Sequence, residues 1–236
     1  MSLKKFREFL DESEEERTYS FEELSPEAQR KVLDDYRDLN VDYNDWHQPI
    51  IEGFEEELKE NFGFDEVEVE YTGFFSQGDG ASFTGKCEDS EKFMRDGLGI
   101  TKSTDLIDMG EEKKSEDGDL VDLIGDLRNI GFDARERYSP DDFYFSVARI
   151  SSRYSHENTI EGEVEVDEIE MEDDDDRDVN GMLQDLVDMT TKWAREKSKE
   201  LYNSLYKYYE ELQEDDVVKE TILANDYKFD KRGNLL

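Results

Sequence analysis

Polar and apolar residues alternate in two stretches of this sequence. In residues 66–71 valine and tyrosine alternate with glutamate, and in residues 159–167 isoleucine and valine alternate with glutamate and aspartate. A period of two residues is typical of a β-strand with one buried face. We therefore expect strands near residues 67–75 and 159–167.

Two more strands complete the expected sheet. The turn sequence Gln77-Gly78-Asp79-Gly80 separates the first strand from residues 80–87, and its glycines reach positive φ at no steric cost. These two strands should therefore form a hairpin. Residues 143–150 are apolar on both faces, which is typical of a central strand.

A helical period of apolar residues appears before and after these strands. It predicts helices over residues 26–39, 46–62 and 181–212, a short one over residues 120–130, and a last one containing Val218 and Ile222. Together the elements predict an α+β fold with a mostly antiparallel sheet of about four strands. Its helices pack on one face, and a long helix lies near the C-terminus.

The same pattern divides the chain into a tail and a domain. Residues 1–17 hold a short amphipathic segment and then an acidic one, so we expect them to be separate from the fold. Residues 18–236 should form a single domain, with an acidic loop insertion near residues 110–119.

Carboxylates form two rows on the polar faces of the alternating strands. Alternate residues of a strand lie about 6.8 Å apart on one face, so each row resembles a line of phosphates. If the two strands paired, like charges would face each other and destabilise the sheet, unless a basic partner bound there. The alternative is an ordinary solvated face. The rows consist of Glu66, Glu68 and Glu70, and of Glu161, Glu163, Glu165 and Asp167.

The charge balance decides which partners are compatible with these rows. The chain has 66 acidic and 29 basic residues and a formal charge of −37. Such a charge disfavours direct binding to nucleic acids and to anionic membranes, which need a basic surface. It favours a basic protein partner, cations or a high-salt habitat, and a chain that is monomeric or only loosely associated.

A calcium site is the main candidate for a bound ion. Asp176, Asp178 and Asn180 stand at positions one, three and five of a calcium-loop pattern, and Gly181 is at position six. The twelfth position is Val187 where a bidentate glutamate is needed. The alternative is an acidic segment that caps the long helix. We expect no other cofactor.

Catalytic groups are scarce. His47, His156 and Cys87 are the only histidines and the only cysteine. Cys87 and His156 would be the one nucleophile and base pair available, but packing in a strand explains this cysteine more simply. No zinc ligand set, phosphate-binding glycine loop, membrane span or secretory signal is evident. We predict a cytosolic protein that is not an enzyme.

The tail carries a short processing pattern. Leu3, Phe6, Phe9 and Leu10 fall on one face of a short basic helix, and Leu10-Asp11-Glu12 precedes Ser13. This arrangement resembles the capsid-targeting tails of internal head proteins of large tailed phages, which a prohead protease cuts after a Leu/Ile-x-Glu site. The resemblance implies cleavage between Glu12 and Ser13 and packaging in the virion head. The alternative is a helix docked on the domain.

Residues 18–236 resemble a second group of proteins. The resemblance rests on Tyr19-Ser20-Phe21, on Ser76-Gln77-Gly78-Asp79-Gly80-Ala81 and on Asn225-Asp226-Tyr227 near the end. The chain is similar to a family of uncharacterised phage and prophage proteins, sometimes labelled antitoxin-like. This resemblance implies a phage gene and assigns no catalytic residue.

Charge and resemblance together give the functional hypothesis. We predict a phage-encoded acidic protein that mimics nucleic acid and inhibits a basic host protein of nucleic-acid handling or defence, in the host cytoplasm. The alternatives are a packaged internal head protein and an antitoxin that neutralises a partner toxin.

Overall fold

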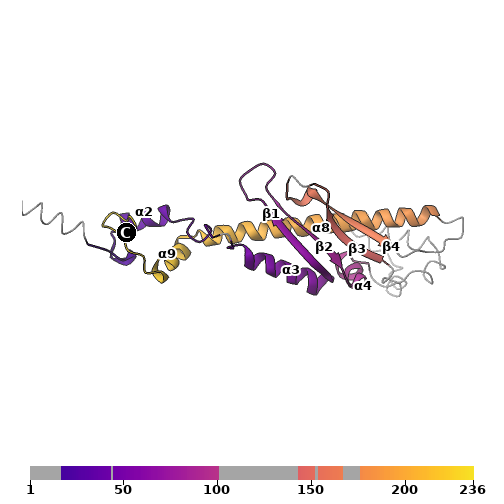
Figure 1. Ribbon diagram of the computed structural model, residues 1–236, viewed down its shortest axis with the longest axis horizontal. Helices are drawn as coiled ribbons and strands as arrows, with labels where there is room; N and C mark the ends of the chain where they lie inside the picture. The colour runs from indigo at the N-terminus through magenta and orange to yellow at the C-terminus, as the bar shows by residue number, and fades with distance from the viewer. Residues whose placement is uncertain (1–16, 44, 101–142, 152–153, 167–175) are drawn as a thin grey trace, which may run out of the picture. The chain divides into compact units, whose positions relative to one another are not determined.

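The computed structural model describes residues 17–43, 45–100, 143–151, 154–166 and 176–236, with the side chains of the last range from residue 183 onward (Figure 1). Its contacts divide the chain into two compact units. The sheet unit spans Ile50–Ser204, and the terminal unit combines the described residues up to Pro49 with Leu205–Leu236. Helix α8 (Asp176–Leu212) contributes residues to both.

The sheet unit contains one antiparallel sheet with the strand order β1-β2-β3-β4. The strands are β1 (Phe64–Tyr71), β2 (Ala81–Cys87), β3 (Phe143–Arg149) and β4 (Ile160–Val166). The prediction of four antiparallel strands in these places is therefore confirmed, although β1 begins three residues earlier than expected and ends before Gly73. Because each strand pairs with its neighbour in sequence, β1 and β4 are the two edges of the sheet.

Helices cover one face of this sheet, as predicted. Helix α3 (Gln48–Phe62) places Phe54 against Phe83 of β2, with ring centroids 5.4 Å apart. Trp193 of α8 lies edge-on to the same Phe83 at 6.0 Å. Figure 1 shows α8 crossing behind the strands. The α+β class, the helices on one face and the long helix are confirmed.

Trp193 is the centre of an aromatic core between this face and the helices. Phe64 stacks on it at 5.1 Å, and Phe93 meets it edge-on at 4.7 Å. Phe93 begins a turn of π-helix, η2 (Phe93–Gly97), directly after the short helix α4 (Ser90–Lys92). Phe64, Phe83 and Phe93 have no exposed surface, so this cluster holds the strands to α8.

A β-bulge in β1 changes the expected alternation. Asp65 pairs with Lys86 and Glu68 pairs with Thr84, so two residues, Glu66 and Val67, stand opposite Gly85 alone. Glu66 has a φ of 51°, a left-handed conformation that non-glycine residues seldom adopt. The bulge lets Phe64 enter the core while Glu68 and Glu70 point away from it. The bulge therefore interrupts the predicted row at Glu66, although the Glu66 carboxylate still lies 2.8 Å from Lys86 of β2.

The bulge makes residue 66 sensitive to side-chain shape. Replacing Glu66 with valine should lower the free energy of unfolding by about 1–2 kcal/mol, because a β-branched side chain is strained at positive φ. The same change at Glu68, which has regular strand pairing, should cost little, since valine favours strands. Urea unfolding of both variants measures the difference. An equal effect at the two positions would contradict the bulge.

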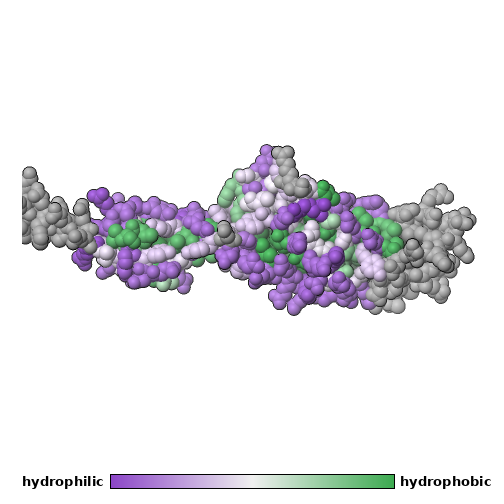
Figure 2. All heavy atoms as spheres, in the orientation of Figure 1, coloured by the Kyte–Doolittle hydropathy of each residue, from purple (hydrophilic) through white to green (hydrophobic). Residues whose placement is uncertain are grey.

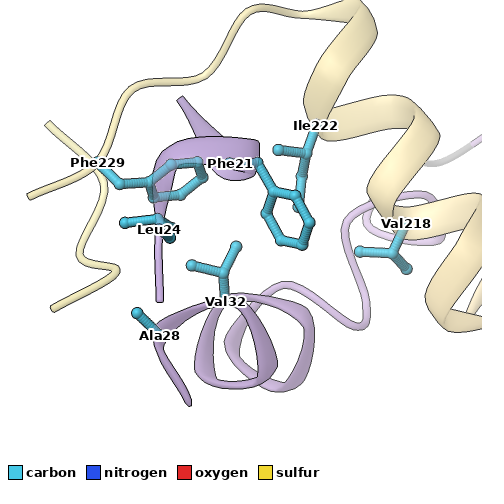
Figure 3. Packing of buried hydrophobic residues seen from close by; sticks show 7 residues of the cluster. All are labelled: Phe21, Leu24, Ala28, Val32, Val218, Ile222 and Phe229. Carbon is cyan, nitrogen blue, oxygen red and sulfur yellow. The ribbon is translucent and has the colours of Figure 1, made fainter. Parts of the chain in front are cut away.

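The terminal unit has its own small core. Helix α2 (Pro26–Asp35) begins at Ser25, whose side chain accepts a hydrogen bond from the Ala28 amide, and α9 (Asp215–Ala224) packs against α2. The segment around Phe229 returns to Tyr19 through two backbone hydrogen bonds of 2.8 Å. Figure 3 shows the buried cluster that these elements enclose, which consists of Phe21, Leu24, Ala28, Val32, Val218, Ile222 and Phe229.

Candidate functional site

The pairing register places the two carboxylate rows on the same face of the sheet. Residues directly opposite each other in an antiparallel pair point to the same side. Glu70 is opposite Ser82 in β1 and β2, Lys86 is opposite Ser146 in β2 and β3, and Ser146 is opposite Glu163 in β4. This face lies opposite Phe83 and the helices. Its carboxylates, named here the acidic face, are Asp65, Glu68, Glu70, Glu161, Glu163 and Glu165.

The two rows lie on the edge strands and do not face each other. Strands β2 and β3 lie between the rows, so β1 and β4 are about 14 Å apart at the usual spacing between neighbouring strands. Each glutamate of β4 stands opposite a neutral residue, and the same holds for Glu68 and Glu70 in β1. Because β1 and β4 do not pair, like charges do not face each other across a strand pair, and the rows need no bound partner to persist.

Glu70 is the most tightly held carboxylate of the acidic face. Its Oε2 lies 2.5 Å from the Arg149 guanidinium and accepts a hydrogen bond of 2.9 Å from the Ser155 hydroxyl. The Arg149 hydrogen bond, and then that of Ser155, lower the pKa of Glu70 below its usual value. Glu70 thus anchors one end of the face and, like the other glutamates of the face, is exposed.

Lysines accompany the carboxylates at the bulge. Lys86 lies 2.8 Å from Glu66, and Lys59 of α3 lies 3.1 Å from Asp65. The hydrogen bond from Lys59 lowers the pKa of Asp65, and the hydrogen bond to Glu66 raises the pKa of Lys86. These pairs are well exposed, so each contributes little to stability, and they leave most of the face uncompensated.

An acidic groove continues the surface around the edge of β1. It has a volume of about 750 Å³ and lies between α3 and β1. Burial, and then the charge of Glu52, raise the pKa of Glu55 within it. In Figure 2, hydrophilic residues cover most of the visible surface around α3 and β1, with hydrophobic residues between them. The groove is lined by Glu52, Glu55, Glu56, Lys59, Glu60, Phe64, Asp65, Glu66 and Val67.

The turn between β1 and β2 is fixed by the segment between β3 and β4. Asp79 Oδ2 accepts hydrogen bonds from the backbone amides of Phe75 and Ser76, at 2.8 and 2.6 Å. Gly78 has a φ of 91°, and a Cβ atom there would come within 2.8 Å of the Tyr154 ring. A Cβ on Gly80 would overlap the Cβ of His156. The two glycines therefore permit close docking, which the sequence alone did not indicate.

The candidate catalytic pair is not assembled. Cys87 ends β2, whereas His156 packs on Gly80 just before β2 begins, so the length of the strand separates them. Cys87 is buried, and burial raises the pKa of its thiol to about 11. This cysteine therefore belongs to the core packing, as the sequence indicated.

The residues of the predicted calcium loop lie on a helix. Asp176, Asp178 and Asn180 lie in the first turns of α8, whereas the pattern anticipated a loop. Their side chains are outside the described residues, so calcium binding stays a prediction. Among the described side chains no cluster of acidic, histidine and cysteine residues has the geometry of a metal site.

The remaining predicted residues belong to parts of the chain that the structure does not describe. Asp167 and the tail residues Leu10, Glu12 and Ser13 lie outside the described residues, as do the acidic insertion near residues 110–119 and the expected helix over residues 120–130. In the part of the chain that the structure describes, no helix is long and apolar enough to cross a membrane.

The chain belongs to the DUF8835 family, a domain of unknown function, whose family model matches residues 46–215. The match contains all four strands, α3 and the acidic groove. No curated protein and no solved structure matches the chain.

Proposed function

We propose that this DUF8835 member is a non-enzymatic interaction protein whose acidic face occupies the cationic groove of a basic, nucleic-acid-handling partner. The observation that carries the proposal is the register, which turns the carboxylates of β1 and β4 to one exposed side of the sheet. Had the rows pointed to opposite sides, they could not bind one groove together.

The spacing of the face supports mimicry of a nucleic acid. Within each row the carboxylates recur about every 6.8 Å, and the two rows are about 14 Å apart. Two parallel lines of negative charge across a gap are also what the phosphates of a duplex present on either side of a groove. A formal charge of −37 would further attract a basic partner and speed its association.

Protection of the sheet edges is the competing explanation. Both rows lie on edge strands, and charged residues there hinder edge-to-edge aggregation. This explanation predicts that reversing the charges changes solubility and leaves partner binding intact. Mimicry predicts that binding is lost.

The biological setting of the proposal rests on resemblance. Similarity to phage and prophage proteins favours a host factor as partner and the host cytoplasm as the place of action. Packaging in the virion would follow from the tail, and mass spectrometry of purified virions would then detect a chain that begins at Ser13.

The decisive experiment is a pull-down with the charges of one row reversed. Glu161, Glu163 and Glu165 are changed together to lysine, and host lysate is applied at low salt. The partner captured by the wild type should bind at least tenfold more weakly, because three phosphate-like charges become repulsive. Duplex DNA and added salt should each elute the partner from the wild type, since both compete for or screen the same charges.

A matched variant controls for net charge. Glu27, Glu210 and Glu220 are exposed residues of the terminal unit, and their change to lysine alters the charge by the same amount. This variant should retain the partner, and circular dichroism should show native folds for both triple variants. Equal capture by the wild type and by the β4 variant would leave edge protection as the explanation of the rows.

A further inference from the structure

Three exposed apolar side chains lie at the end of the sheet where the β1–β2 turn and the segment between β3 and β4 meet. Phe75 is 76% exposed, Ile150 is 57% exposed and Tyr154 is 40% exposed, in a chain of which 40% of residues are charged. Exposed large apolar side chains that lie at one end of a domain often mark a binding surface. We name these three residues the apolar tip.

The backbone holds the apolar tip in a defined conformation. The amide of Phe75 is bound to Asp79 Oδ2, and the Asp79 amide donates in turn to the Ser76 carbonyl at 3.1 Å. The Tyr154 ring lies directly over Gly78. Ile150 is fixed by a hydrogen bond of 2.9 Å from its amide to the Thr159 carbonyl. A partner would therefore meet a preorganised surface and lose little chain entropy on binding.

The Tyr154 segment of the apolar tip adjoins the acidic face, and Phe75 belongs to the turn that this segment contacts at Gly78. Ser155, next to Tyr154, donates its hydroxyl hydrogen to Glu70 Oε2 at 2.9 Å, and Glu70 is the last carboxylate of the β1 row. Ser82, which stands opposite Glu70 on the acidic face, has no exposed surface. The segment that carries Tyr154 therefore lies on the acidic side of the sheet, at the end of both rows.

We infer that the apolar tip is the anchor of the same interface: Phe75 inserts into an apolar pocket at the end of the partner's cationic groove. This inference rests on the proposed function and adds the chemistry that makes the partner specific. Charge alone attracts any polycation, whereas buried aromatic anchors supply much of the affinity in protein interfaces.

The negative charge around the apolar tip favours a basic protein as its partner over a second copy of the chain and over an anionic membrane. A second copy of the chain would bring its own carboxylates against the acidic face, and an anionic membrane would be repelled in the same way. A basic surface with a hydrophobic pocket complements the acidic face and the apolar tip at once.

Two synthetic peptides test the inference. One contains ten residues of lysine and glycine, and the other has leucine in place of two central glycines. Wild-type protein should bind both in a salt-sensitive manner by fluorescence anisotropy, and should bind the leucine peptide at least tenfold more tightly, because leucine gains an apolar contact at the tip. Replacing Phe75 with alanine should remove this preference and leave binding of the lysine–glycine peptide unchanged.

The controls separate a failed inference from a failed function. Tyr43→Ala removes an aromatic side chain that is 60% exposed in the terminal unit, and it should keep the preference for leucine. Equal affinity for the two peptides, or a preference that survives Phe75→Ala, overturns the inference while the acidic face stands. If neither peptide binds, or if the β4 lysine variant binds both as well as the wild type, the proposed function fails and the inference fails with it. Self-association that Phe75→Ala abolishes would assign the tip to a second copy and also overturn the inference.

Discussion

Replacing Phe229 with alanine is expected to lower the free energy of unfolding of the terminal unit by about 3–5 kcal/mol. Phe229 has no exposed surface, and its ring meets Tyr36 edge-on at 6.2 Å. Its backbone also exchanges two hydrogen bonds with Tyr19. Loss of the ring would leave a cavity in a core of only seven buried residues, which has little material to fill it.

The two tryptophans make the effect assignable to a unit. Trp46 belongs to the terminal unit, where it lies 5.6 Å from Tyr209, and Trp193 belongs to the sheet unit. In two parent proteins, each with one tryptophan replaced by phenylalanine, Phe229→Ala should lower the urea midpoint reported by Trp46 more than the midpoint reported by Trp193, each relative to its own parent. Leu223→Ala is the control, because Leu223 is 40% exposed on α9 and its loss should cost less than about 1 kcal/mol. Equal shifts at both tryptophans would show that the units unfold as one.

Replacing Gly162 with alanine should destabilise the sheet unit by about 1–3 kcal/mol, the usual cost of overpacking. A Cβ atom at this position of β4 would lie 2.6 Å from the Thr190 side chain and 2.8 Å from the Thr191 amide nitrogen. The Gly162 amide also donates a hydrogen bond of 2.8 Å to the Thr191 hydroxyl. An added methyl group would push α8 away from the sheet and stretch this bond.

Gly53 provides a matched control in the same unit. It lies inside α3, and a methyl group added there would meet no atom within 4 Å beyond its chain neighbours and its own helix backbone, so alanine fits without strain. Gly53→Ala should therefore stabilise the protein by about 0.5–1 kcal/mol, because alanine favours the helix. Urea unfolding followed through Trp193 measures both variants. A neutral result for Gly162→Ala would mean that α8 does not approach β4 as closely as the structure indicates.

Much of the sheet unit was predictable because its signals are local. Alternation in β4 and the glycines before β2 mark strands and a turn whatever the rest of the chain does. The periodicity of α3 and α8 marks their buried sides in the same way. The negative charge also follows from composition alone, and with it the expectation of a basic partner.

The bulge at Glu66 could not be predicted, because it depends on the partner strand. Only the pairing with β2 shows that Phe64 and Glu68 must point to opposite sides, although they are four positions apart and would share a face in a regular strand. The sequence offers just one local hint, since Phe64 would otherwise share the polar face of the glutamates.

The sequence by itself determined the two carboxylate rows, the elements that carry them and the acidic character of the surface, because composition and short-range periodicity encode these properties. The tertiary structure alone decided that the rows lie on opposite edges of one face, that an acidic groove extends them along α3, and that the Tyr154 segment orders the β1–β2 turn. These features join residues far apart in the chain, and strand order and register, which depend on packing of the whole sheet against α3 and α8, bring them together.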